Sequence, residues 1–284
     1  MSEHPKNFPE FYVTTAQACP YLAGRQERKL FTHLTHDKPP GDIDDLLRGG
    51  FRRSQSIAYM PYCESCNACV STRVPVELFD LKRSFRRVVE RNTDVVATRM
   101  AAKPTAEQYM LFRSYIEGRH ADGGMADMSI PDFAVMVEDG LPGTFITEYR
   151  LMPATAAVPT AEQSAQWPRG AQAGRLVAVA LCDRVSDGVS MVYSFYDCDE
   201  IERSLGTYMI LEQIEHARTM QLPYLYLGYW VNGSPKMDYK RRFQPQEQLG
   251  AEGWELVAPG DEPADRSANF DAPAFAWLRR LMGT

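Results

Sequence analysis

The sequence of 284 residues predicts an α+β fold, because helical and strand-like patterns follow one another along the chain. Residues 204–220 carry apolar side chains at helical spacing, among them Leu205 and Ile214, which indicates an amphipathic helix. The nearly unbroken apolar and aromatic run 224–231 follows it and is typical of a strand covered on both faces. Three further strand-like runs precede the helix, at residues 145–151, 175–185 and 189–197.

Residues 1–103 form the predicted N-terminal domain, a small α+β unit of short helices and strands. The helices are expected at residues 26–34, 43–48 and 84–92. Asp42 is expected to cap the second helix and Ser84 the third, and Gly49-Gly50 ends the second. The strands are expected on either side of a cysteine-containing loop, at residues 55–62 and 71–77.

Residues 104–258 form the predicted second domain. Thr105 is expected to cap a helix over 106–120 and Ser204 the helix over 204–220, since a side-chain oxygen there satisfies an otherwise unpaired backbone N–H. Asp187-Gly188 is typical of a hairpin turn between the last two strand-like runs. Gly228 interrupts the aromatic strand, which predicts a bulge or a close approach of a ligand to the backbone. The remaining stretches are a long loop over 153–174 and a C-terminal linker and helix over 259–284.

The composition is that of an ordinary globular chain, with 44% hydrophobic and 24% charged residues. No stretch reaches 18 uncharged apolar residues, and the first residues lack the apolar core of an export signal. We therefore expect no association with a membrane. The six cysteines are then predicted to be reduced thiols in a cytoplasmic protein.

The charge of the chain is unevenly distributed. The formal net charge is −6, yet residues 82–103 hold seven basic side chains against only Glu90 and Asp94. Such a strip is either a solvated helix face or a surface that contacts phosphates. Arg86 and Arg87 are the candidates for phosphate contact.

Four cysteines are spaced as candidate metal ligands: Cys19, Cys63, Cys66 and Cys69. Thiolates in this pattern could hold zinc or an iron–sulfur cluster. They could equally be reduced thiols that pack as small hydrophobic side chains.

A basic turn follows the aromatic strand, with Asp238 and Tyr239 between Lys236 and Lys240. This stretch is either a solvated patch beside a core strand or the border of a pocket for an anionic or nucleotide-bearing ligand. The second interpretation has a structural basis, because ligands of open α/β sheets bind outside the carboxyl ends of the strands.

Two ordered blocks of the chain resemble the arginyl-tRNA–protein transferase family. The matching stretches are Cys19-Pro20-Tyr21, Gly49-Gly50-Phe51-Arg52-Arg53-Ser54, Cys63-x-x-Cys66-x-x-Cys69, Ser204-Leu205-Gly206-Thr207, Tyr226-Leu227-Gly228-Tyr229-Trp230 and Lys236-Met237-Asp238-Tyr239-Lys240. Together they span most of residues 10–250, and the opening of the first block is most similar to the bacterial branch, the aspartate/glutamate leucyltransferases. Eukaryotic members carry a second cysteine where this chain has Leu22, which weakens the case for a shared metal site.

The resemblance implies a reaction and its partners. Such enzymes take the aminoacyl group from a charged tRNA, here Leu-tRNA, and attach it to the N-terminal amine of a protein that starts with Asp or Glu. The product is a degradation signal, and no cofactor is required. The resemblance also implies the acyltransferase fold of the N-acetyltransferases (a GNAT-like fold) for the second domain.

The same resemblance suggests roles for single residues. A buried acidic side chain must meet a cation, and each charge-assisted hydrogen bond is worth roughly 1.5–3 kcal/mol. The candidates for that contact are Arg25, Arg73, Lys236 and Lys240; each arginine could instead form a surface ion pair of little energetic weight.

The remaining candidates act on the reaction and the tRNA. Asp238 and Tyr239 are candidates for accepting or relaying the proton of the attacking amine. Those for contacting the tRNA are Ser204, Arg86 and Arg87, with Tyr226 and Trp230 as rings on which its terminal adenine could stack.

Other functions stay open on sequence alone. Arginine could replace leucine as the transferred group. An acyl-CoA-dependent N-acyltransferase is less favoured, because no glycine-rich pyrophosphate loop precedes the long helix. A non-catalytic module that binds acidic N-termini is a further alternative.

Overall fold

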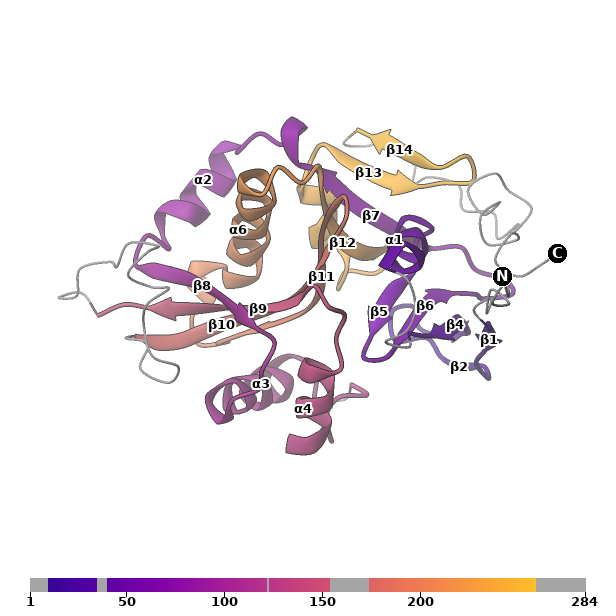
Figure 1. Cartoon of the computed structure of the whole chain (residues 1–284), viewed down its shortest axis with the longest axis horizontal. Helices are drawn as coiled ribbons and strands as arrows, with labels where there is room; N and C mark the ends of the chain where they lie inside the picture. The colour runs from indigo at the N-terminus through magenta and orange to yellow at the C-terminus, as the bar shows by residue number, and fades with distance from the viewer. Residues whose placement is uncertain (1–9, 35–39, 122, 154–173, 259–284) are drawn as a thin grey trace, which may run out of the picture. The chain divides into compact units, whose positions relative to one another are not determined.

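The computed structural model describes residues 10–34, 40–121, 123–153 and 174–258 (Figure 1). The chain divides into two compact units: the first holds residues 1–79 and 226–284, and the second holds residues 80–225. The predicted domain boundaries at 103 and 258 do not coincide with this division, because the chain returns to the first unit after residue 225. The predicted loop over 153–174 lies almost wholly, and the predicted C-terminal linker and helix wholly, outside the described residues.

The first unit contains two antiparallel arrangements built from short strands. One is a sheet in the order β1–β4–β6–β5, made of Tyr12–Val13, Lys29–His33, Ile57–Pro61 and Arg52–Ser54. The other is the two-stranded ribbon of β2 (Gln17–Ala18) and β3 (Gln26–Glu27). Helix α1 (Pro40–Arg48) precedes β5. Leu30, Leu46, Phe51, Met60 and Tyr229 are buried together in its core.

The first unit also holds four neighbouring strands in the order β14–β13–β7–β12. Their bounds are Trp254–Val257, Gln246–Leu249, Cys69–Pro75 and Tyr224–Val231. Strand β12 begins in the second unit and continues into the first. The short helices η1 (Val76–Leu78) and η3 (Asp238–Arg242) follow β7 and β12.

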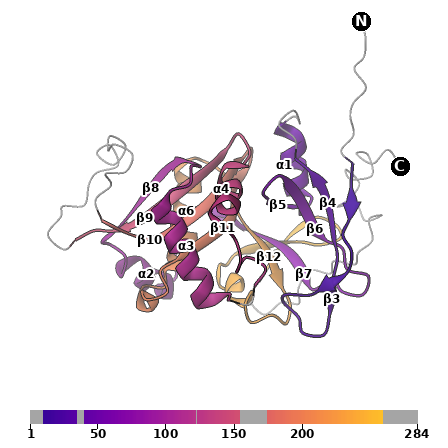
Figure 2. The ribbon, with the colours of Figure 1, turned by 90° about the horizontal axis from the view of Figure 1, so that it is seen from below.

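The second unit is a sheet in the order β11–β10–β9–β8, with helices on both faces. The strands are Gly188–Tyr196, Arg175–Val185, Thr144–Leu151 and Val95–Ala101. Helix α6 (Leu205–Thr219) lies on one face, and α3 (Ala106–Arg119) and α4 (Ile130–Glu138) lie on the other (Figures 1 and 2). Helix α2 (Arg83–Glu90) contacts α6, and the short helix η2 (Ile201–Arg203) leads into it.

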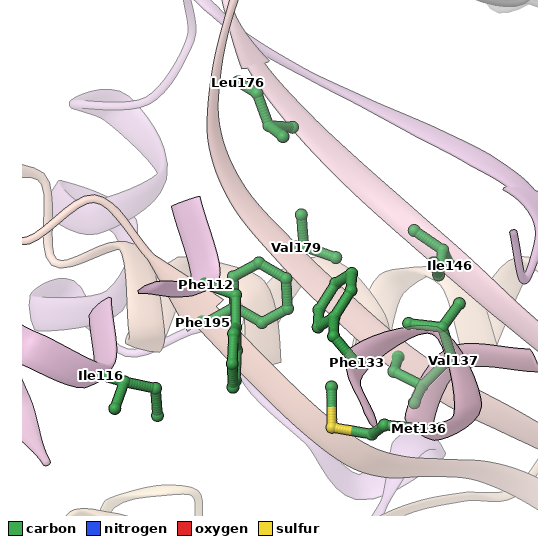
Figure 3. Close-up of a cluster of buried hydrophobic side chains, with 10 residues drawn as sticks. Phe112, Ile116, Phe133, Met136, Val137, Ile146, Leu176, Val179 and Phe195 are labelled. Carbon is green, nitrogen blue, oxygen red and sulfur yellow. The ribbon is translucent and has the colours of Figure 1, made fainter. Parts of the chain in front are cut away.

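The core beneath α3 and α4 combines phenylalanine rings with aliphatic side chains (Figure 3). Phe112 of α3, Phe133 of α4 and Phe195 of β11 are all almost completely buried, and the ring centroids of Phe112 and Phe133 are 5.2 Å apart. Rings at this separation add packing energy beyond the area that they bury. These contacts hold both helices against the sheet.

Several sequence predictions are confirmed. Helices and strands are mixed throughout the described chain, as the α+β class requires. The order of strands, hairpin, helix and strand from β9 to β12 is as expected. The hairpin turn is Ser186-Asp187, one residue before the predicted Asp187-Gly188, because Gly188 is already paired with Val185. Thr105 caps α3 with a complete capping box, in which the backbone N–H of Gln108 donates to the Thr105 hydroxyl.

The predicted helix over 26–34 is wrong. Leu30 and Thr32 are buried while their neighbours are more exposed, an alternation that belongs to a strand. β4 pairs with β6, with Leu30 opposite Met60. A run this short does not distinguish helix from strand, and the pairing partner decided the outcome.

Three predicted helix caps are also wrong. α1 begins at Pro40, so Asp42 lies inside its first turn. The N-cap of α2 is Lys82, so Ser84 is a residue of the helix itself. Ser204 precedes α6 but makes no capping hydrogen bond, because its φ of 53° is left-handed whereas a capping residue needs extended backbone.

Candidate active site

The candidate site of the first unit is built around Gly228 in β12. Its φ is +81°, a conformation that side chains rarely tolerate. A Cβ atom on Gly228 would lie 2.8 Å from Nε of Arg52 and 2.9 Å from its Cζ. The Thr72 hydroxyl donates to the Gly228 carbonyl oxygen at 2.9 Å. The group that lies against this glycine is the Arg52 guanidinium of the protein itself, and the approach of a ligand predicted from the sequence stays a prediction.

Lys240 is the second cation of this site. Its side chain is 7% exposed, and its Nζ donates to the Tyr229 carbonyl oxygen at 2.6 Å. The pKa of Lys240 is lowered from its ordinary 10.5 to about 7, mainly by burial and also by the positive charge of Arg52, while Cys69 opposes the change. The amine therefore titrates near neutral pH.

Tyr229 connects this cation to the strands of the first unit. Its hydroxyl lies 2.7 Å from the Gly50 carbonyl oxygen and 3.0 Å from that of Tyr59, so it can donate to either. Burial raises the pKa of Tyr59, and the nearby Arg52 and Lys29 act in the opposite direction. Burial also raises the pKa of Tyr21. Both phenols are therefore neutral hydrogen-bonding groups at physiological pH.

The positive charge of Arg52 and Lys240 favours the binding of an anion beside them. Arg52 is 9% exposed, so two cationic side chains are largely withdrawn from water within electrostatic range of each other. A carboxylate bound beside them would offset their mutual repulsion and would favour the protonated form of Lys240. The arrangement is suited to holding an acidic group.

Arg73 has other partners. Its Nε and Nη2 each lie 2.7 Å from the same carboxylate oxygen of Glu247, and its Nη1 donates to the Tyr226 hydroxyl at 3.1 Å. The guanidinium also lies 4.2 Å from the ring centroid of Trp254. A substrate carboxylate would have to compete with Glu247 for this arginine.

The other candidates for the acceptor and for proton transfer lie at the surface. Arg25 is exposed and donates to the Ser65 carbonyl oxygen at 3.4 Å. Lys236 and Asp238 are exposed, and Tyr239 is 43% exposed with its ring centroid 5.9 Å from the Lys240 amine. Lys240 is thus the one candidate of its motif that is buried.

The candidates for contacting the tRNA are divided between the units. Tyr226 and Trp230 are buried, at 2% and 1% exposure, so a base could stack on either ring only after the neighbouring groups moved. Ser204, Arg86 and Arg87 belong to the second unit. Arg86 and Arg87 of α2 are exposed, and Arg86 donates from Nε to the Leu81 carbonyl oxygen.

The cysteines are not gathered into a metal site. Among the residues that the structure describes, no group of three or more His, Cys, Asp or Glu side chains could hold a metal ion. Cys63 lies opposite Cys66 in an isolated antiparallel bridge, whereas Cys69 begins β7 and lies near Lys240. A metal at these cysteines stays a prediction.

Sequence reasoning did not single out Arg52, although it lies in the Gly-Gly-Phe-Arg-Arg-Ser stretch shared with the family. Two adjacent arginines directly after Phe51 were the available signal, since Phe51, Arg52 and Arg53 are all buried in the structure.

No helix in the described parts of the chain is long and apolar enough to cross a membrane.

Comparison with known proteins identifies the family. The family model described as "Arginine-tRNA-protein transferase, N terminus" matches residues 17–87, and the C-terminus model of that family matches residues 107–250. A protein of Xanthobacter autotrophicus named "Aspartate/glutamate leucyltransferase" is 56% identical over 257 residues, which cover 90% of this chain and 99% of that protein. One of the same name from Bradyrhizobium sp. (strain ORS 278) is 53% identical over 265 residues, covering 93% and 98%.

Two solved structures are more distantly similar. FemX is 10% identical with a TM-score of 0.44, and the match covers 73% of this chain and 64% of FemX. A tandem GNAT protein from the clavulanic acid biosynthesis pathway is 12% identical with a TM-score of 0.38, over 88% of this chain and 65% of that protein. The two family models and the relatives with more than half of their residues identical establish that this chain belongs to the arginine-tRNA–protein transferase family.

Proposed function

We propose that this protein transfers leucine from Leu-tRNA to the N-terminal amine of proteins that begin with Asp or Glu, which marks them for degradation. The observation that carries the proposal is the 56% identity, over nearly the whole length of both chains, to a relative named for this activity. The pair of buried cations, Arg52 and Lys240, supports an acidic acceptor.

The proposed acceptor contact uses Lys240 and Arg52 rather than Arg73. The side-chain carboxylate of the acceptor would accept hydrogen bonds from the Lys240 ammonium and the Arg52 guanidinium. Arg73 is already bound to Glu247, so its pairing stabilises β7 against β13. An acceptor with a neutral Asn or Gln would bring no negative charge to these two buried cations and would lose the charge-assisted hydrogen bonds, which is the physical basis of discrimination.

The reaction itself is aminolysis of an activated ester. The acceptor α-amine attacks the leucyl carbonyl carbon, the new C–N bond forms, and the bond to the ribose oxygen of the tRNA breaks. The amine has an ordinary pKa of about 7.7–8.0, so a neutral fraction exists without a strong base. Positioning of the two substrates could supply about 7–11 kcal/mol of the acceleration.

Asp238 and Tyr239 remain the proposed groups for taking the proton that the amine loses. Their exposure leaves them accessible to a substrate amine. Asp238→Asn removes the basic oxygen but keeps the shape of the side chain, so it should lower kcat with little change in KM. An unchanged kcat would exclude Asp238 from this role.

The exposed arginines of α2 support contact with the tRNA. We propose that Arg86 and Arg87 bind phosphates of the acceptor stem, since both are exposed in a basic strip of a chain that is acidic overall. Replacing both with Gln should weaken tRNA binding. The logarithm of the binding constant should then fall less steeply with the logarithm of the salt concentration, with the slope smaller in magnitude by about 0.9 for each lost phosphate contact.

The decisive assay offers labelled Leu-tRNA and Arg-tRNA separately to peptides that differ only in starting with Asp, Glu, Asn or Ala. Transfer of leucine to the Asp and Glu peptides alone is the expected result. Transfer of arginine would keep the reaction and change the donor. If neither tRNA donates to any peptide while the protein is folded by circular dichroism, the proposed function fails.

A second experiment locates the acceptor contact. Lys240→Met should raise KM for the Asp peptide by roughly ten- to a hundredfold, the equivalent of one charge-assisted hydrogen bond. Arg73→Met should lower the melting temperature without a comparable change in KM. The opposite pattern, with KM sensitive to Arg73 and not to Lys240, would assign the carboxylate to Arg73.

A further inference from the structure

Cys63 and Cys66 face each other across a two-residue turn. They are the partners of an isolated antiparallel bridge in the connection between β6 and β7, and Glu64-Ser65 form the turn between them. Directly opposed residues of an antiparallel pair have Cα atoms about 4.5–5.5 Å apart. A disulfide needs Cα atoms about 4.4–6.8 Å apart, so the backbone already provides the required separation. Neither thiol is in a disulfide, and both residues are partly exposed.

Cys69 provides a comparison within the same stretch. It is separated from Cys66 by the same number of residues as Cys66 is from Cys63. Cys69, however, is the first residue of β7, and no bridge pairs it with Cys66. The preceding Ala68 is held by its carbonyl oxygen, which accepts from the Asn232 backbone N–H at 2.9 Å. Equal spacing in the sequence therefore leads to different geometry.

The turn between Cys63 and Cys66 is fixed by residues 25–28. Arg25 donates to the Ser65 carbonyl oxygen at 3.4 Å, and the Arg28 guanidinium lies 3.4 Å from the Glu64 carboxylate. The Arg28 carbonyl oxygen accepts from the Tyr62 backbone N–H at 2.7 Å and lies 3.8 Å from the Cys63 sulfur. These contacts hold the two cysteines in their opposed positions.

We propose that Cys63 and Cys66 form a reversible disulfide, with a small-molecule disulfide such as glutathione disulfide as the oxidant. One cysteine thiolate attacks a sulfur of glutathione disulfide, which forms a mixed disulfide and releases one glutathione thiolate. The second cysteine then attacks the protein sulfur of that mixed disulfide and releases the second glutathione. Two thiols are oxidised, one disulfide is reduced to two glutathione molecules, and the protons of the two protein thiols pass to the released thiolates.

The disulfide would compete with metal binding. Thiolates are the form that binds zinc or iron, and the disulfide removes two of the four cysteines predicted as ligands. A protein oxidised at this pair could therefore hold no metal through Cys63 and Cys66. The proposal is independent of the transfer reaction, and its test uses no tRNA.

Mass spectrometry of the full-length protein tests the proposal. The protein is treated with a chelator, equilibrated in buffers of reduced and oxidised glutathione, alkylated and digested with trypsin. Cleavage after Arg53 and Arg73 yields one peptide, residues 54–73, which contains all three neighbouring cysteines. We expect a form of this peptide that carries one alkyl group, on Cys69, and is two hydrogen atoms lighter than the reduced peptide with a single alkyl group, because Cys63 and Cys66 are joined.

Variants with one cysteine replaced distinguish the Cys63–Cys66 disulfide from the other possible pairs. Cys69→Ser should retain the lighter form, and Cys63→Ser and Cys66→Ser should each lose it. Melting curves of the reduced variants establish that each remains folded. The proposal is overturned if the native protein forms the Cys66–Cys69 disulfide as readily, or if no intramolecular disulfide forms at any glutathione ratio. It is also overturned if unfolded protein gives the same distribution of pairs, since the fold would then have no part in the selection.

Discussion

The Arg52 guanidinium occupies the space into which a side chain on Gly228 would project, with Nε 2.8 Å from the position of a Cβ atom there. The two residues are far apart in the sequence and adjacent in the first unit. The missing side chain of Gly228 and its positive φ are therefore linked to the position of a buried cation. The consequence can be tested through both stability and acceptor binding.

Gly228→Ala should displace the Arg52 guanidinium and raise KM for the Asp peptide. The positive φ alone should cost roughly 1–2 kcal/mol of folding free energy, measured by chemical denaturation. Gly233→Ala is the matched control, because Gly233 has a φ of +80° but its Cβ would meet only Leu22 Cδ2 at 3.6 Å. Gly228→Ala should lose more stability than Gly233→Ala, because only its Cβ would meet Arg52, and only Gly228→Ala should bind the acceptor more weakly. Equal KM values in the two variants would contradict a role for Arg52.

The buried amine of Lys240 should make stability depend on pH. Its pKa of about 7 in the folded protein lies below its ordinary 10.5, so the charged form destabilises the folded state. This cost is complete below pH 7 and disappears as the pH approaches 10.5. Lys240→Met removes it, so the free energy of unfolding of the variant relative to the wild type should fall with rising pH, by up to about 1.4 kcal/mol per pH unit. Urea denaturation between pH 6 and pH 9 measures the difference; a constant difference would show that Lys240 does not titrate in this range.

Acceptor binding should follow the same titration. An acidic acceptor favours charged Lys240, so KM for the Asp peptide should rise above pH 7, by up to about tenfold per pH unit. Lys240→Arg carries a permanent charge and should remove the dependence. The comparison is made with initial rates from pH 6 to pH 9, with kcat followed separately because the α-amine also titrates there. A wild-type KM that is independent of pH would separate Lys240 from the acceptor.

Thr105 and Ser204, which precede α3 and α6, should differ in how much they stabilise their helices. Thr105→Ala breaks the capping box of α3 and should cost about 1 kcal/mol of folding free energy. Ser204→Ala removes a hydroxyl that makes no capping bond and should cost much less. Guanidinium denaturation of the two variants at the same pH gives the comparison. Equal losses would mean that Ser204 caps α6 in solution.

Much of the fold of the second unit could be predicted from the local periodicity of apolar residues. The runs that became β10, β11, α6 and β12 are long, and each has one periodicity that matches its burial. Shorter elements were misjudged or missed. β4 was taken for a helix, and β8, α4, β13 and β14 were not anticipated, because a few residues leave helix and strand equally plausible until a partner pairs with them.

The sequence by itself determined the family, the mixed fold and the cationic motif that contains Lys240. Each of these can be inferred from the types of residues and their spacing along the chain. Only the tertiary structure decided which cation of this motif is buried, because the low pKa of Lys240 results from desolvation and from Arg52, which comes from another segment. It likewise left Lys236 exposed, bound Arg73 to Glu247 and set Cys63 opposite Cys66 rather than Cys66 opposite Cys69. Burial and charge are properties of the whole neighbourhood of a side chain, and that neighbourhood is assembled only when distant segments fold together.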